Sequence, residues 1–158
     1  MQSIVRPIEH GDFEDAQAVY RAAALGVPDG IYSPSIKAEW ANRTNSEFLE
    51  KSFSRQRFVA QLGKAIVGYV GYDQNRSTLT ECYVLPAYQG FGIGKQLVRY
   101  VLRCANEDRL EKLTVLASKN AVEFYERCGF FVERAEALVM GDGRLLDCYR
   151  MSIYLAAA

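Results

Sequence analysis

The segment AYQGFGIGKQL, residues 87–97, constrains the fold most, because it places glycines at three alternate positions, Gly90, Gly92 and Gly94. Glycine loses more backbone entropy on folding than other residues, so three glycines this close together need a structural reason. The apolar run 78–85 that precedes the segment predicts a β-strand, and the apolar periodicity that follows it predicts a helix. The segment is therefore predicted to be a glycine loop that joins a strand to a helix.

A loop of this kind can bind a phosphate. The first N–H groups of a helix have no partner within the helix, and the helix dipole adds a partial positive charge there. The dinucleotide pattern G-x-G-x-x-G does not match the spacing G-x-G-x-G, and a P-loop needs four residues between its glycines where this chain has three. Gln96 also stands where a P-loop has Ser or Thr after its lysine. The remaining alternatives are a phosphate cradle of another kind and a glycine-rich turn without a ligand.

The rest of the chain predicts an α/β (α+β) fold with a mixed, mostly antiparallel central sheet flanked by helices. Strands are expected at residues 3–8, 56–62, 65–73, 78–85, 112–117, 130–140 and 144–155, and helices at 13–25, 34–42, 46–53, 93–106 and 120–128. Asp12 and Ser33 are expected to cap the first two helices, and Gly129 to follow the last one. No repeat or linker divides the chain, so residues 1–158 are expected to form a single domain.

Composition excludes several classes of function. The 19 basic and 19 acidic residues cancel, which argues against nucleic acid or an acidic membrane as the main partner. No apolar run approaches the ~18 residues of a membrane span, and the first residues lack the apolar core of a secretory signal, so a cytoplasmic protein is expected. The four cysteines have no CxxC spacing and the chain has one histidine, so no metal site is expected.

Two sequence blocks resemble the GNAT superfamily of acyl-CoA-dependent N-acyltransferases. The block CYVLPAYQGFGIG, residues 82–94, is similar to that superfamily's strand followed by its Q/R-x-x-G-x-G/A motif. The block LTVLASKNAVEFYERCGFF, residues 113–131, is similar to its strand, Asn and F-Y-E-x-x-G-F segment. The resemblance implies a GNAT-like fold, acetyl-CoA as co-substrate without a metal, and transfer of an acetyl group to a primary amine.

The resemblance also implies a coenzyme site. In the superfamily the loop amides bind the pyrophosphate, and the preceding strand pairs with the pantetheine arm. The positions that match these roles, together with an Asn that often contacts the coenzyme and a Tyr near its sulfur, are Cys82, Tyr83, Val84, Gln89, Gly90, Phe91, Gly92, Ile93, Gly94, Lys95, Asn120 and Tyr125. Lys95 has the alternative of a solvated lysine, and Asn120 that of a helix cap.

Two residues are candidates for catalysis. Tyr125 matches a tyrosine that family members place near the thioester sulfur, where a phenol can assist the departing thiolate. Its alternative is a core aromatic residue. Glu81 is the first candidate for the base that deprotonates the amine, alone or through a water, and is expected to share a strand face with Leu79 and Tyr83. Its alternative is an ordinary exposed glutamate.

The amine acceptor is not identified by the sequence. Tyr32 and Trp40 are candidates to line its pocket, and Trp40 is equally explained as core. The leading interpretation is direct attack of a small-molecule amine or peptide in a ternary complex, without a cysteine as acyl carrier. The alternatives are a non-catalytic acyl-CoA-binding module and a protein N-terminal or lysine acetyltransferase. A homodimer is a further expectation, since dimers are common in proteins that this chain resembles.

Overall fold

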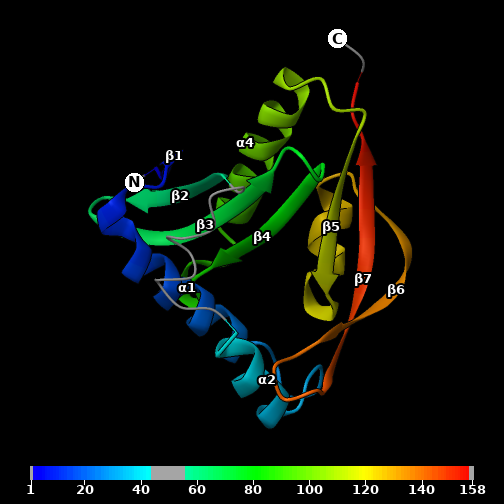
Figure 1. Cartoon of the computed structure of the whole chain (residues 1–158). Helices are drawn as coiled ribbons and strands as arrows, with labels where there is room; N and C mark the ends of the chain where they lie inside the picture. Colours follow the sequence, from blue (N-terminus) through cyan, green and yellow to red (C-terminus); the bar gives the residue numbers. More distant parts are fainter. Residues whose placement is uncertain (1, 44–55, 157–158) are drawn as a thin grey trace.

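The computed structural model describes residues 2–43 and 56–156, so the helix expected at 46–53 lies outside the described residues. Its centre is one seven-stranded sheet with the order β1-β2-β3-β4-β5-β7-β6 (Figure 1). The strands are β1 Ile4–Pro7, β2 Gln56–Leu62, β3 Ala65–Asp73, β4 Thr78–Val84, β5 Lys112–Ser118, β6 Phe131–Val139 and β7 Leu145–Tyr154. All neighbours are antiparallel except β4 and β5, which confirms the mixed, mostly antiparallel sheet.

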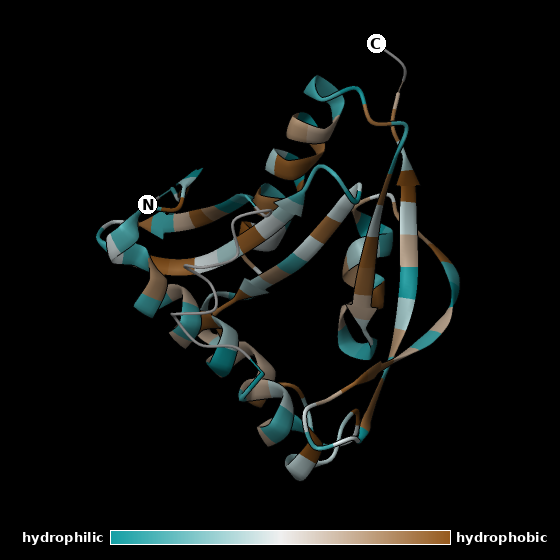
Figure 2. Ribbon diagram, in the orientation of Figure 1, coloured by the Kyte–Doolittle hydropathy of each residue, from teal (hydrophilic) through white to brown (hydrophobic). Residues whose placement is uncertain are grey.

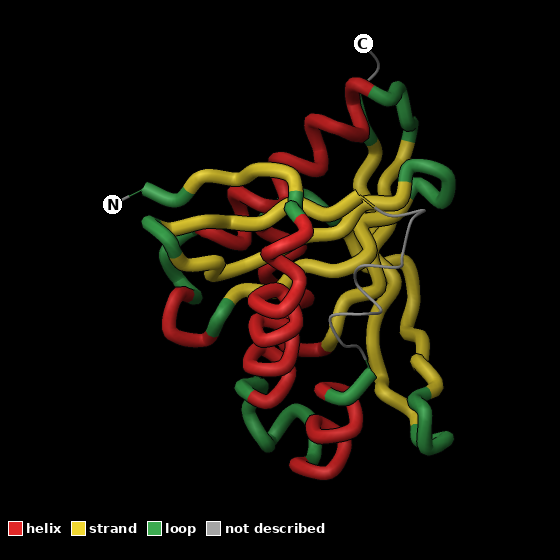
Figure 3. Tube along the Cα trace, turned by 60° about the vertical axis from the view of Figure 1, so that its left-hand side comes forward, coloured by secondary structure: helices red, strands yellow, loops and turns green. Residues whose placement is uncertain are grey.

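Helices cover both faces of the sheet, as Figure 3 shows from the side. On one face, α1 (Phe13–Leu25) and α2 (Pro34–Ala41) pack with a cluster that includes Tyr69. On the other face, α4 (Ile93–Glu107) and α5 (Val122–Arg127) pack with a second cluster. The sheet thus separates two hydrophobic cores, and each core orders one set of helices.

The helix α4 has the apolar stripe that the sequence predicts. Leu97, Val98, Val101 and Ala105 are fully buried, while polar residues occupy the other side. Figure 2 shows the resulting alternation of hydrophobic and hydrophilic residues along α4. Burying one stripe of side chains fixes the rotation of the helix on the sheet, and hence the direction in which its first turn points.

The local signals at the helix ends are partly confirmed. The Ser33 hydroxyl accepts from the Ile36 N–H at 3.3 Å, and Gly129 follows α5 with φ of +102°. The prediction for Asp12 is wrong, because its carboxylate does not cap α1. It accepts from the Glu9 N–H at 2.8 Å and pairs with Arg6 at 2.7 Å, so it closes the 3-10 turn before α1 instead.

The strands β4 and β5 diverge. They pair only at Thr78 with Thr114 and at Leu79 with Val115, after which the two strands separate (Figure 1). From Thr80 to Val84 the edge of β4 that faces β5 therefore has no strand partner. Such an edge leaves backbone N–H and C=O groups available to another extended chain.

Candidate active site

The glycine loop after β4 has a backbone that needs glycine at two of its three positions. Gly90 and Gly92 have φ of +85° and +84°, the left-handed region that other residues rarely adopt. A Cβ at either position would meet no protein atom within 4 Å, so both face open space. A Cβ at Gly94 would instead lie 3.0 Å from the Phe124 ring, so this glycine allows α4 to pack closely on α5.

The loop presents the first turn of α4 as a set of amide donors. Gly92 is the N-cap of α4, and the first intrahelical bond runs from the Gln96 N–H to the Gly92 carbonyl at 3.0 Å. The N–H groups of residues 93–95 thus have no acceptor within the helix. Gln89 closes the loop from the other side by donating its amide to the Val84 carbonyl at 3.0 Å.

A first cavity, here named the loop cavity, lies between this loop, β4 and α5 and has a volume of about 500 Å³. Residues predicted for the coenzyme site that line it are Cys82, Tyr83, Val84, Gln89, Gly90, Gly92, Gly94, Lys95 and Asn120. Tyr125, also predicted to contact the coenzyme, does not line this cavity but the second one described below. Two other predicted residues do not line it either: the Phe91 side chain is 76% exposed, and the Ile93 side chain is buried in the core. Both can contribute only through the backbone there.

Asn120 does not have the local structure predicted for it. It lies inside the 3-10 turn Lys119–Ala121, and α5 begins after Ala121. The helix cap proposed as its alternative role is therefore wrong, because the chain makes a tight turn before the helix starts. Its place in the lining of the loop cavity leaves its side chain available to a ligand.

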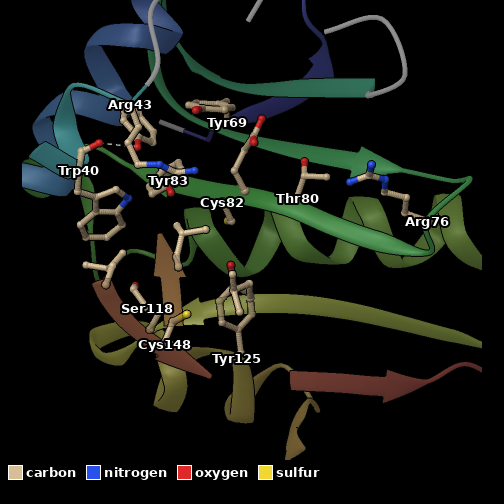
Figure 4. A pocket seen from close by; sticks show the side chains of 16 residues that line it. Trp40, Arg43, Tyr69, Arg76, Thr80, Cys82, Tyr83, Ser118, Tyr125 and Cys148 are labelled. Atoms are coloured by element: carbon tan, nitrogen blue, oxygen red, sulfur yellow. Dashed lines mark hydrogen bonds between the residues drawn. The ribbon is translucent and has the colours of Figure 1, made fainter. Parts of the chain in front are cut away.

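A second cavity, here named the aromatic cavity, has a volume of about 380 Å³ and lies on the other side of the β4–β5 gap (Figure 4). The described residues that line it are Tyr20, Trp40, Arg43, Tyr69, Arg76, Thr80, Glu81, Cys82, Tyr83, Leu116, Ser118, Ala121, Tyr125, Leu138, Leu146 and Cys148. The lining residues that it shares with the loop cavity are Trp40, Cys82, Tyr83, Ser118 and Ala121. The two cavities therefore meet where β4 and β5 separate.

Tyr125 lies at this meeting point. It comes from α5, is 4% exposed, and its hydroxyl points toward β4 and Cys82 in Figure 4. Burial raises the pKa of the Tyr125 phenol well above its usual value, so the hydroxyl keeps its proton at physiological pH. A neutral phenol in this position can donate a hydrogen bond to an atom that becomes negative.

Glu81 lines the aromatic cavity and is held by a buried arginine. The Arg57 Nε donates to Glu81 Oε1 at 2.6 Å, and the two side chains are 2% and 12% exposed. The predicted neighbours of Glu81 are partly wrong. The register of β3 and β4 shifts between Gly71 and Tyr72, so Leu79 faces the core below α4 whereas Glu81 and Tyr83 face the aromatic cavity.

Cys82 lines both cavities, but its thiol is not reactive. Burial raises the pKa of the Cys82 thiol to about 12. A thiolate, not a thiol, is the nucleophile in acyl transfer by cysteine. Cys82 therefore acts here as a small apolar wall between the two cavities.

The two residues predicted for the acceptor pocket have different positions. Trp40 is buried and lines both cavities. Tyr32 packs edge-on against Trp40 with ring centroids 5.8 Å apart, but it lines neither cavity. The Tyr32 hydroxyl donates to the Asp147 carbonyl at 2.6 Å and accepts from the Lys119 N–H at 2.8 Å, which ties the loop before α2 to β7 and to the end of β5.

Sequence reasoning missed several lining residues, among them Tyr20, Arg43, Tyr69 and Arg76. Their signals are weak because they come from four separate segments, namely α1, the chain just after α2, β3 and the β3–β4 turn. Arg43 follows the end of α2, so its side-chain position does not follow from helical spacing.

The chain is similar to several known proteins. A family profile described as an acetyltransferase (GNAT) domain matches residues 16–144. An uncharacterized N-acetyltransferase YafP of Escherichia coli K12 is 29% identical over 126 residues, which are 80% of this chain and 79% of that protein. A ycf52-like N-acetyltransferase of Prochlorococcus marinus is 34% identical over 63 residues, 40% of this chain, and the match spans only 35% of that protein's length.

Solved structures share the fold. A GCN5-related N-acetyltransferase from Rhodopseudomonas palustris superposes with a TM-score of 0.90 at 23% identity, covering 98% of this chain and 97% of that one. The PaiA N-acetyltransferase from Thermoplasma acidophilum, solved in complex with coenzyme A, gives a TM-score of 0.80 at 18% identity, covering 98% and 99%. No helix among residues 2–43 and 56–156 has the length and apolar character needed to cross a membrane.

Proposed function

Because the chain belongs to the GNAT family of acetyltransferases, we propose that it transfers the acetyl group of acetyl-CoA to a primary amine by direct attack. The observation that supports this most is the meeting of two cavities at the β4–β5 gap, with Tyr125 beside it. One cavity suits an anionic, extended coenzyme, and the other a compact organic acceptor. A reaction between the two requires such a junction.

The residues of the loop cavity fit coenzyme A. The left-handed backbone at Gly90 and Gly92 leaves open space in front of the first-turn amides, which favour a pyrophosphate. The unpartnered edge of β4 offers Cys82 and Val84 to the peptide-like pantetheine arm. When bound, acetyl-CoA supplies a thioester whose C–S bond breaks as the N–C bond of the amide forms.

Two residues are assigned to the chemical steps, one to deprotonation of the amine and one to stabilisation of the leaving sulfur. An alkylamine has a pKa of about 10, so it must lose a proton before it can attack. We assign this step to Glu81 or to a water that Glu81 holds, because its carboxylate lines the aromatic cavity. Tyr125 stabilises the departing sulfur by donating a hydrogen bond to it. A phenol with a raised pKa is better suited to donating a hydrogen bond than to giving up its proton completely.

Direct attack is favoured over an acyl-enzyme route. Cys82 is the thiol at the junction, and a pKa of about 12 keeps it protonated. Cys148 also lines the aromatic cavity, and burial raises its pKa as well. Neither thiol is activated for attack on a thioester.

A thiol-release assay with acetyl-CoA and a panel of amines, amino acids and peptides tests the proposal. We expect release that depends on an acceptor, together with the mass increase of one acetyl group on that acceptor. If the protein binds acetyl-CoA by calorimetry but acetylates none of the panel, the non-catalytic acyl-CoA-binding alternative replaces this proposal.

A further inference from the structure

We propose that the acceptor is a small primary amine that also carries a carboxylate, and that the Arg43 guanidinium binds this carboxylate. This inference rests on the proposed function, since it names the substrate class of the same site. Three properties of the aromatic cavity support it: its charge, its walls and the position of Arg43 relative to Tyr125.

The charge of the aromatic cavity is positive where a ligand can reach it. Its charged lining residues are Arg43, Arg76 and Glu81. The Glu81 carboxylate is compensated by Arg57, and Arg76 lies 4.0 Å from Asp73. No carboxylate of residues 2–43 and 56–156 pairs with Arg43, and its side-chain partner among them is the neutral phenol of Tyr20. Within the described part of the chain, the Arg43 charge is therefore uncompensated where the cavity is open to a ligand.

The walls of the cavity suit a compact molecule with an apolar body. Tyr83 contacts three other rings, with centroid distances of 4.9 Å to Tyr20, 5.8 Å to Tyr69 and 6.4 Å to Trp40. Burial raises the pKa of Tyr20 to about 12 and that of Tyr83 well above its usual value, so these phenols are neutral. A volume of about 380 Å³ lies near the lower limit for small-molecule sites.

The positions of Arg43 and Tyr125 would hold the carboxylate and the amine of the acceptor in different parts of the cavity. In Figure 4 the Arg43 side chain extends beside Tyr83 at one end of the cavity, whereas Tyr125 and Cys82 lie nearer its middle. A carboxylate bound at Arg43 leaves the amine of the same molecule directed toward the junction with the loop cavity. A guanidinium is also suited to this task, because its fork can donate two parallel hydrogen bonds to one carboxylate.

Basic peptides and polyamines do not fit this cavity. Recognition of several positive charges needs a groove with uncompensated carboxylates. Glu81 is the one carboxylate in the lining described here, and it is already paired with Arg57. The charge of the cavity thus separates an acidic amine from the basic substrates of a lysine-directed enzyme.

The test compares matched acceptors that differ only in charge. L-phenylalanine, L-leucine and L-methionine are each assayed against their carboxamides and against the amines that lack the carboxyl group. We expect kcat/KM to be about 10- to 100-fold higher for the acids, the range of a hydrogen-bonded charge. The amine of the carboxamide is less basic than that of the acid, so more of it is neutral at a given pH. Easier deprotonation would therefore favour the carboxamide and cannot explain a preference for the acid.

Variants of Arg43 assign the preference to one residue. Arg43→Gln should lower kcat/KM for the acids about 10- to 100-fold and leave the carboxamides within about threefold. Arg43→Lys should restore part of the loss. Arg21→Gln is the matched control, because Arg21 bonds Asn42 at 2.7 Å and does not line the cavity.

The outcomes separate the inference from the proposed function. Turnover of carboxamides and simple amines as fast as the acids would overturn the inference while the acetyltransferase function stands. Equal losses for acids and carboxamides in Arg43→Gln would overturn the role of Arg43 in the same way. Absence of acetylation of any amine by a protein that binds acetyl-CoA would overturn the proposed function, and the inference with it.

Discussion

The loop cavity and the aromatic cavity lie side by side along β4, yet they are built in different ways. The loop cavity is formed mainly by residues 82–95, with further lining from α1, α2, the end of β5 and α5, and the loop contributes backbone amides. The aromatic cavity is formed by side chains from α1, α2, β3, β4, β5, α5 and the β6–β7 hairpin. The backbone amides of the loop keep their positions in any sequence that keeps the glycines. In the aromatic cavity, by contrast, each lining side chain can be substituted without changing the others. Under the proposed function, the first cavity can therefore keep its coenzyme while substitutions in the second change the acceptor.

Removal of the hydroxyl at the junction should have the largest effect. In Tyr125→Phe we expect kcat to fall by ~10²–10⁴ with the Kd of coenzyme A nearly unchanged. Because burial raises the phenol pKa well above 10, its ionisation should cause no loss of wild-type activity between pH 6 and about 10. Steady-state kinetics across pH measures both. Tyr72→Phe is the control, since it removes a hydroxyl bonded to Asp108 outside both cavities; equal losses in the two variants would refute the assignment.

Neutralising the carboxylate of the aromatic cavity should have the next largest effect. Glu81→Gln keeps the size of the side chain but removes the base, so we expect kcat/KM to fall by about 10² at neutral pH. Coenzyme A affinity should not change, because Glu81 does not line the loop cavity. Kinetics and calorimetry on the same preparation separate the two cavities. Full activity in Glu81→Gln would assign the base to another group.

A change in the glycine loop should affect the other cavity alone. Gly92→Val places a β-branched residue at φ of +84°, in the space before the amides. We expect coenzyme A to bind about 10- to 100-fold more weakly by calorimetry, because the free loop can relax and must regain about 1–3 kcal/mol of strain to bind. Gly143→Val is the matched control, because Gly143 has φ of +85° and equally open surroundings but lies in the β6–β7 turn. Unchanged affinity in Gly92→Val would remove the pyrophosphate assignment.

A substitution of Tyr32 tests whether this residue supports the fold or belongs to the acceptor pocket. Loss of its two hydrogen bonds in Tyr32→Phe should lower the free energy of unfolding by about 1–3 kcal/mol, measured by denaturant titration. The exposed Tyr154 provides a control, whose Phe variant should change stability by less than about 0.5 kcal/mol. A changed KM for the acceptor with unchanged stability would instead place Tyr32 in the acceptor pocket.

The smallest effect is expected at the thiol shared by both cavities. Cys82→Ala should lower kcat less than about tenfold, because a thiol with a pKa of about 12 is not ionised at the pH of the assay. Cys104→Ala, outside both cavities, provides the reference. Loss of all activity, or a burst of thiol release without an acceptor in the wild type, would support an acyl-enzyme route instead.

Much of the fold and of the loop cavity was predictable because its signals are local. The apolar stripe of α4, the cap at Ser33 and the glycine after α5 each depend on residues within a few positions of one another. The capping of α1 was not predictable in the same way. The Asp12 carboxylate binds the Arg6 guanidinium on β1 and the Glu9 N–H, so it is not left to accept from the first N–H groups of α1.

The sequence alone determined the strand–loop–helix unit, since a left-handed backbone at Gly90 and Gly92 and a helix N-terminus are properties of consecutive residues. Only the tertiary structure decided which side chains line the aromatic cavity. The register shift in β4 turns Glu81 away from the face of Leu79, and folding brings Arg43 to the same cavity. Contacts between segments far apart in the chain depend on sheet register and on helix packing. Neither produces a pattern among neighbouring residues from which the contact could be predicted.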